Sequence, residues 1–205
     1  VVVNNTASIS ATDVAMNATE ITVAGSVTAT NDVRLSSDGS MTINGNVAAS
    51  RDANLTASSG LSVAGKVTAT NATTLNAGSI TVNGKVETTN EKTTLTSAEI
   101  TVNGSVNTTI GTTTLTSASD LTLNGSGTVS GKAVNVNAGQ DFFHNGGSIS
   151  GENAVITATR NVQLQGGSIA ATNASLTAGN NMSLASGSIV ADTIALTATS
   201  GAITE

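Results

Sequence analysis

The chain has 205 residues, a formal net charge of −6 and only 1% aromatic residues, and it contains no proline, cysteine or tryptophan. An acidic chain without a basic stripe cannot neutralise phosphates, which excludes a nucleic-acid partner. No apolar run is long enough to cross a bilayer, so we do not expect membrane insertion. The lack of cysteine rules out disulfides and zinc–thiolate sites. Regularly spaced apolar residues and low charge argue against disorder.

The first residues, Val1 to Asn5, lack the basic segment and the apolar run of a signal peptide. We therefore expect the chain to be an interior segment of a longer mature protein.

Along the chain, apolar residues alternate with polar ones over short runs, as at Ile21, Val23 and Val27. This pattern predicts short β-strands, and each stretch of about 20 residues has room for three strands and three corners. In the stretch that begins at Ile21, the corners are predicted at residues 24–25, 31–32 and 37–39.

A unit of about 20 residues repeats along the whole chain. Residues 80–86 (ITVNGKV) return as residues 100–106 (ITVNGSV), and residues 93–97 (TTLTS) return as residues 113–117. Self-similarity at this period predicts a solenoid. One isolated apolar residue recurs in each unit: Met16, Leu35, Leu55, Leu75, Leu95, Leu115, Val136, Ile156, Leu176 and Leu196.

The predicted fold is all-β: a right-handed parallel β-helix of about ten coils of about 20 residues, continuous from residue 1 to residue 205. Equivalent positions keep the same residue type, as stacked parallel coils require. Hairpins in a sandwich or barrel are the alternative, because they also contain short alternating strands. At one strand spacing per coil, the rod would be roughly 50 Å long.

Glycines mark one corner of each unit. Asn44, Asn83, Asn103, Asn124 and Asn145 each precede a glycine, and this pair readily adopts a positive φ. We predict that the last four of these asparagines form an amide ladder in stacked coils. Insertions near residues 125–131 indicate a change of repeat subtype, after which Gly-Gly-Ser-Ile corners appear.

Residues 173–184 (NASLTAGNNMSL), followed by 187–189 (GSI), resemble filamentous haemagglutinin repeats. These repeats occur in the large exoproteins of bacterial two-partner secretion, including adhesins and contact-dependent inhibition proteins. The resemblance implies a parallel β-helix that is secreted and displayed on the bacterial cell surface, with an outer-membrane two-partner secretion transporter as its partner during export. The family's amino-terminal secretion domain and its toxin modules are not evident in the chain.

We expect a structural shaft that extends functional ends away from the cell. An adhesive module is the first alternative, in which outward Thr, Ser and Asn side chains contact a cell-surface receptor or glycan. A polysaccharide-acting enzyme is a distant third, since lyases and glycosidases share the β-helix fold. We predict no enzymatic activity: His144 is the only histidine, and no serine lies in a nucleophile elbow.

Three acids recur at one position of the unit. Glu99, Asp120 and Asp141 each lie five residues before the unit's glycine. Their oxygen ligands predict a weak Ca²⁺ site shared by a neighbouring pair, and no other cofactor is expected. The alternative is a solvated corner without a metal.

The only aromatic cluster is Phe142, Phe143 and His144. The strand register predicts that Phe142 and His144 point inward and that Phe143 points outward. A buried imidazole needs hydrogen-bond partners. We therefore predict that a neighbouring hydroxyl or amide satisfies His144, with a local bulge that turns the ring outward as the alternative.

Overall fold

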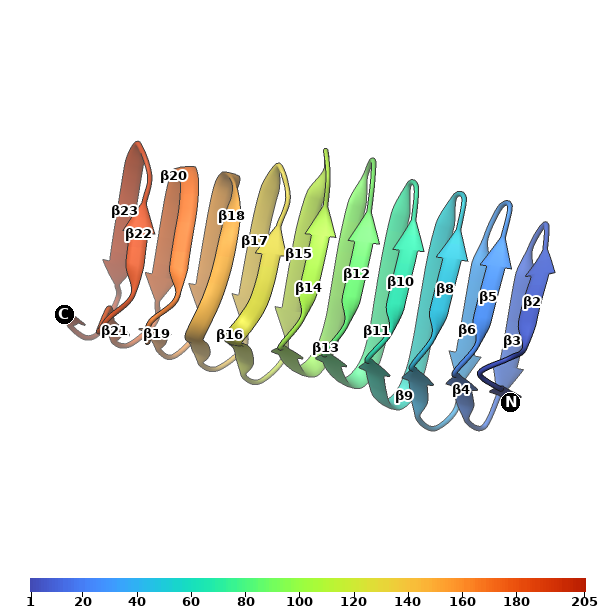
Figure 1. The fold of residues 1–205 in the computed structure, drawn as a ribbon. Helices are drawn as coiled ribbons and strands as arrows, with labels where there is room; N and C mark the ends of the chain where they lie inside the picture. Colours follow the sequence, from blue (N-terminus) through green and yellow to red (C-terminus); the bar gives the residue numbers. More distant parts are fainter.

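The computed structural model describes residues 1–205 and contains 24 strands and no helix (Figure 1). Strands of successive coils pair in parallel, and the coils stack in a row from the amino-terminal to the carboxyl-terminal end. The single antiparallel contact is an isolated bridge between Gln165 and Ser186. The parallel β-helix of about ten coils is therefore confirmed, and hairpins in a sandwich or barrel are excluded.

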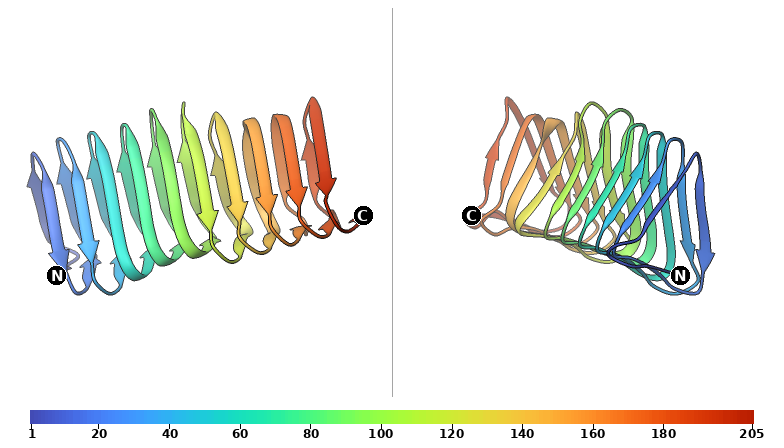
Figure 2. Two further views of the ribbon diagram at one scale, coloured as in Figure 1. Left: turned by 180° about the vertical axis from the view of Figure 1, so that it is seen from behind. Right: turned by 45° about the vertical axis from the view of Figure 1, so that its right-hand side comes forward.

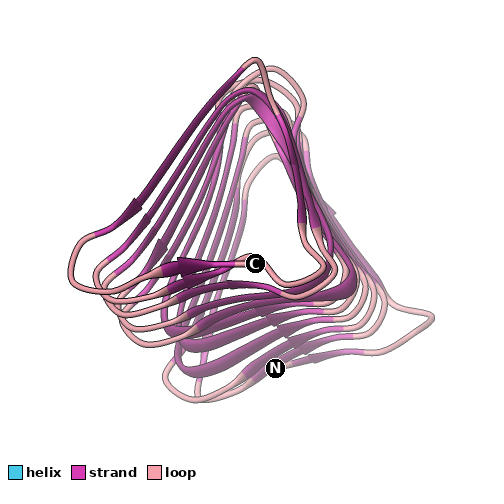
Figure 3. Cartoon of the chain, turned by 90° about the vertical axis from the view of Figure 1, so that its left-hand side faces the viewer, coloured by secondary structure: helices cyan, strands magenta, loops and turns pink.

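Each coil is a triangle with three faces (Figure 3). In Figure 3 the carboxyl-terminal coils lie nearest the viewer, and the chain turns counterclockwise as it advances toward the viewer, which is the right-handed sense. Figure 2 shows the same stack from two further sides. The first face carries β1 (Val2–Val3), β4 (Ile21–Val23), β7 (Met41–Ile43), β19 (Val162–Leu164), β21 (Met182–Ser183) and β24 (Ile203–Thr204).

The other two faces follow in the same order in every coil. The second face carries β2 (Ser8–Ala11), β5 (Ser26–Ala29), β8 (Asn46–Ala49), β10 (Lys66–Ala69), β12 (Lys85–Thr88), β14 (Ser105–Thr108) and β22 (Ser188–Val190). The third face carries β3 (Val14–Ala18), β6 (Val33–Ser37), β15 (Thr112–Ser117), β17 (Ala133–Ala138) and β23 (Thr193–Ala198).

Six longer strands bend around a corner. Strands β9 (Asp52–Val63), β11 (Ala72–Val82) and β13 (Lys92–Val102) run from the third face onto the first face of the next coil. Strand β16 (Leu121–Ser130) joins the first and second faces, and β20 (Ser168–Ala178) joins the second and third. Strand β18 (Phe142–Ala158) spans all three faces.

The core is a single cluster of 47 buried apolar residues inside the triangle. Leu95 pairs in register with Leu75 and Leu115, and all three are fully buried. Burying one such side chain stabilises the fold by about 1.5–3 kcal/mol. Thr94, one residue earlier, points outward and is half-buried. The period-two register is therefore confirmed.

The corner glycines have a different cause from the one predicted. Positive φ occurs at Gly146, Gly147 and Gly166 but not at Gly45 or its counterparts in the earlier coils. A side chain at Gly45 would collide with the carbonyl oxygen of Gly25 in the preceding coil. The prediction of positive φ was wrong for the early Asn-Gly corners, which need glycine because stacked backbones approach closely there.

A register shift coincides with the insertions near residues 125–131. The pairing of β16 with β18 shifts register between Gly125 and Thr128. Ser126 and Gly127 lie opposite the single residue Gly147 of β18 and form a bulge between the first and second faces. The next corner, at Gly131 and Lys132, is then reached with the parallel pairing restored.

Candidate functional site

The acid column lies at the corner that precedes the first face. Glu99, Asp120 and Asp141 stand immediately before Ile100, Leu121 and Phe142, which pair with one another in successive coils. Glu99 is exposed, Asp120 is half-buried and Asp141 is only 6% exposed. The three side chains therefore occupy one corner but differ in their access to solvent.

Two of the three carboxylates bind the backbone of the next coil. Asp120 Oδ1 accepts a hydrogen bond from the N–H of Asp141 at 3.0 Å. Asp141 Oδ1 accepts from the backbone N–H and from Nδ2 of Asn161, at 2.9 and 2.8 Å. The guanidinium of Arg160 lies 3.2 Å from Asp141 Oδ2. These contacts give Asp120 and Asp141 a structural role at the corner, whereas the exposed carboxylate of Glu99 has no such contact.

The series continues with asparagines at the same corner. Asn161 Oδ1 accepts from the N–H of Asn181 at 3.2 Å, and Asn181 Oδ1 accepts from the N–H of Ala202 at 3.1 Å. Each side chain satisfies a backbone donor that the corner leaves without a strand partner. No group of three or more His, Cys, Asp or Glu side chains is close enough to hold a metal ion. Calcium binding by a neighbouring pair stays a prediction.

A second charged cluster was not predicted. Asp32 is 1% exposed and contacts two arginines: its Oδ2 lies 2.6 Å from Arg34, and its Oδ1 accepts from Nε of Arg51 at 2.7 Å. The hydrogen bond from Arg51 is the main reason that the pKa of Asp32 lies below its usual value, although burial opposes this shift. Arg51 lies 19 residues after Asp32, so a comparison of charges one coil apart would have found the pair.

Buried threonines form a second unpredicted feature inside the corner between the second and third faces. Their hydroxyl groups form a continuous series of hydrogen bonds along the axis of the β-helix, and each hydroxyl oxygen lies 2.7 to 2.9 Å from the next. This series of hydrogen bonds ends at the backbone carbonyl oxygen of Ser130, which lies 2.6 Å from the hydroxyl oxygen of Thr113. Every buried hydroxyl therefore has a partner, as a narrow apolar core requires. The five buried threonines of this series are Thr73, Thr88, Thr93, Thr108 and Thr113.

His144 points inward and is fully buried, as predicted, and its ring centroid lies 5.9 Å from that of Phe142. The predicted satisfaction of its ring was wrong, because neither ring nitrogen has a hydrogen-bond partner. The inward residues of the adjacent coils at this position are Leu123 and Leu164, which offer no polar group. Burial lowers the pKa of His144 to about 4, and the backbone of Gly147 opposes this shift only in part.

The predicted amide ladder is confirmed at the corner between the first and second faces. Nδ2 of Asn103 donates to Oδ1 of Asn83, and Nδ2 of Asn124 donates to Oδ1 of Asn103, both at 2.7 Å. Nδ2 of Asn145 donates to Oδ1 of Asn124 at 3.3 Å. Asn44 precedes a glycine at the same corner but takes no part in the ladder.

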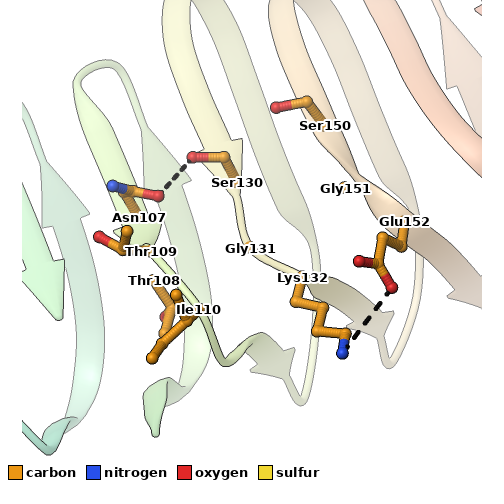
Figure 4. A pocket seen from close by; sticks show the side chains of 10 residues that line it. All are labelled: Asn107, Thr108, Thr109, Ile110, Ser130, Gly131, Lys132, Ser150, Gly151 and Glu152. Atoms are coloured by element: carbon orange, nitrogen blue, oxygen red, sulfur yellow. Dashed lines mark hydrogen bonds and ion pairs between the residues drawn. The ribbon is translucent and has the colours of Figure 1, made fainter. Parts of the chain in front are cut away.

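A polar groove of about 520 Å³ lies across three coils at the corner between the second and third faces (Figure 4). One wall is the end of β14 with Asn107 and the exposed Ile110, and Ser130 Oγ on the floor donates to Asn107 Oδ1 at 2.8 Å. Lys132 Nζ lies 4.0 Å from Glu152 Oε2 at the other side. Glycines 131 and 151 leave this floor without side chains. A ligand in the groove would meet hydroxyl, amide and charged groups beside one apolar side chain.

The fold and these corners define a class: a repetitive β-solenoid whose polar side chains mainly join one coil to the next. Residues 1–144 match the model of the family described as hemagglutinin repeat. The chain therefore belongs to this family, whose members are non-enzymatic repeats of secreted, cell-surface adhesins in a two-partner secretion context. Neither the curated proteins nor the solved structures give a match. The structure contains no helix that could span a membrane.

Proposed function

We propose that the chain is a structural shaft of a bacterial exoprotein, which an outer-membrane two-partner secretion transporter exports and which holds functional ends away from the cell surface. Uninterrupted stacking is the observation that supports this role. Each coil continues the same three faces and the same core, and the largest irregularity is the bulge at Ser126 and Gly127. Stacked repeats add length without changing their neighbours, which is what a spacer requires.

Deletion of whole coils tests the shaft role. Removal of residues 61–99 takes out two whole coils and joins Gly60 to Ile100. Gly60 holds the same position in the repeat as Glu99, so the strand register continues across the junction. The shortened chain should fold and should be about 10 Å shorter in small-angle scattering, at one strand spacing per coil. Removal of residues 61–90, which takes out one and a half coils, is the matched control and should not fold. A compact particle, or a shortened chain that fails to fold, would contradict the proposal.

The groove supports adhesion to a receptor or glycan as a second candidate function. It combines Ser130, Ser150, Asn107 and the Lys132–Glu152 pair with the exposed Ile110. Fluorescently labelled chain should then bind cells saturably, and Ser150→Phe, which fills the groove, should abolish binding. Lys85→Ala, outside the groove, should leave it unchanged. If no saturable binding occurs, only the shaft role is supported.

A glycosidase typically needs a pair of carboxyl groups across its cleft. The groove offers one carboxylate, that of Glu152, which faces Lys132. Chemistry of this kind therefore has no support from the arrangement of the groove.

A further inference from the structure

We propose that Asn44 is a site of spontaneous deamidation, and that the amide ladder protects the equivalent asparagines in later coils from the same reaction. This inference goes beyond the shaft role and does not depend on it. It rests on a comparison within one chain, because the same Asn-Gly pair recurs at one corner in different surroundings.

The backbone of the corner is the same in the coils compared. The N–H groups of Gly45, Gly84 and Gly104 each donate to a carbonyl of the preceding coil at 2.9 Å. The acceptors are Val23, Val63 and Val82, which hold equivalent positions on the first face. The glycine nitrogen, which is the attacking atom in deamidation, is therefore restrained alike in the three corners. The difference between them lies in the asparagine side chains.

Asn44 lacks an amide neighbour. The residues above and below it at this corner are Ala24 and Ala64, and its exposed side chain makes no hydrogen bond within the chain. Asn103, by contrast, donates to Asn83 and accepts from Asn124, both at 2.7 Å. Its amide group must break both bonds before it can turn toward the glycine nitrogen, whereas that of Asn44 turns freely.

The reaction needs only water. The nitrogen of Gly45 loses its proton to water and bonds to Cγ of Asn44, while the bond from Cγ to Nδ2 breaks and ammonia leaves. Water then opens the resulting five-membered ring at either carbonyl carbon. One opening gives an aspartate, and the other gives an isoaspartate whose main chain runs through the former side chain. One molecule of water is consumed and one of ammonia is released.

Either product changes the corner. Both add a negative charge to a chain that already carries a net charge of −6. The isoaspartate also lengthens the main chain by one carbon, beside a glycine whose backbone has no room for a side chain against Gly25. Reaction at Asn44 should therefore loosen the stacking of this coil on the one before it.

Peptide mapping by mass spectrometry after incubation of the folded chain at mildly alkaline pH measures each asparagine separately. We expect Asn103 to react roughly thirtyfold more slowly than Asn44, the factor that corresponds to about 2 kcal/mol for two net hydrogen bonds. Equal rates, or faster loss at Asn103, would overturn the proposal.

Two variants with opposite expected effects make the test independent of absolute rates. Ala64→Asn extends the ladder from Asn83 to Asn44 and should slow the reaction at Asn44. Asn83→Ala removes the acceptor of Asn103 and should speed the reaction there while leaving Asn44 unchanged. Circular dichroism confirms that each variant is folded before incubation. If the rate at Asn44 does not change in Ala64→Asn, the ladder does not protect and the proposal fails.

Discussion

Replacement of Leu95 by aspartate should be among the most damaging single changes in the chain. Leu95 is fully buried between Leu75 and Leu115. Loss of a buried leucine costs about 3–5 kcal/mol through lost transfer energy and the remaining cavity. The new carboxyl group has no partner in this apolar column, so it must stay protonated, and at pH 7 this costs about 4 kcal/mol relative to its ordinary pKa. The sum, about 7–9 kcal/mol, is comparable to the whole stability of a typical domain.

Urea unfolding followed by circular dichroism measures this loss, with Thr94→Asp as the matched control. Thr94 lies one residue earlier and points outward, so its replacement should cost less than about 1 kcal/mol. The part of the Leu95→Asp defect that comes from protonation should disappear near pH 4, where the free carboxyl group also binds a proton. Equal damage from both variants at pH 7 would refute the inward and outward assignment on which the core argument rests.

Three further predictions concern the corners and the ends. If a neighbouring pair among Glu99, Asp120 and Asp141 binds Ca²⁺, millimolar Ca²⁺ should raise the melting temperature. Asp120→Asn should abolish this gain, although its amide oxygen can still accept the hydrogen bond from the Asp141 N–H. Calorimetry that shows no shift with Ca²⁺ would contradict metal binding. Because Arg51 holds the pKa of Asp32 below its usual value, the stability from this contact is present at neutral pH and is lost as the pH falls through the folded-state pKa. Asp32→Asn should lack this acid-dependent part in urea midpoints measured across pH. In the 205-residue chain, hydrogen exchange should be fastest outside about residues 20–190, since Val2 and Val190 are each 66% exposed and Ile203 is 44% exposed; strong protection that reaches Val1 would contradict this.

The repeating part of the structure could be predicted from the sequence because each coil provides an independent copy of the same signal. One leucine says little, but ten apolar residues at intervals of 19 to 21 residues define the period, and the period determines which residues stack. The inward position of Leu95 and the ladder from Asn83 to Asn145 both follow from this register. Physical contact between coils is therefore readable wherever the chain repeats itself.

Features that depend on close contact were not predictable from the period alone. The glycine at position 45 looks the same in sequence whether it serves a positive φ or a close backbone approach, and the structure shows the second. Asp120 and Asp141 recur at one position, but the sequence does not show that each carboxylate reaches the backbone N–H of the next coil. The groove is lined by three corners, residues 107–110, 130–132 and 150–152, and the sequences of these corners share no simple pattern.

His144 is the residue at which regular stacking conflicts with side-chain chemistry, because the inward position leaves both ring nitrogens without a partner. Strand β18, which carries His144, pairs with β16, β17, β19 and β20, and Glu152 is the only other ionisable residue in these five strands. Glu152 faces Lys132 in the groove. No carboxylate is therefore available to stabilise a charged imidazole in the core. Protonation of His144 must favour the unfolded chain.

The pH dependence of folding gives the sign and size of this effect. The pKa of His144 is about 4 in the folded chain, and an unfolded histidine has a pKa near 6.5, so the unfolded chain binds the proton first as the pH falls. Stability should be fully present above about pH 6.5 and should decrease by about 3 kcal/mol on approach to pH 4. His144→Leu, which matches Leu123 and Leu164 in the same column, should lose this part of the pH dependence, while the carboxylates contribute equally to both chains. Urea midpoints at several pH values measure the difference, and parallel curves for the two chains would show that the imidazole is not confined to the core.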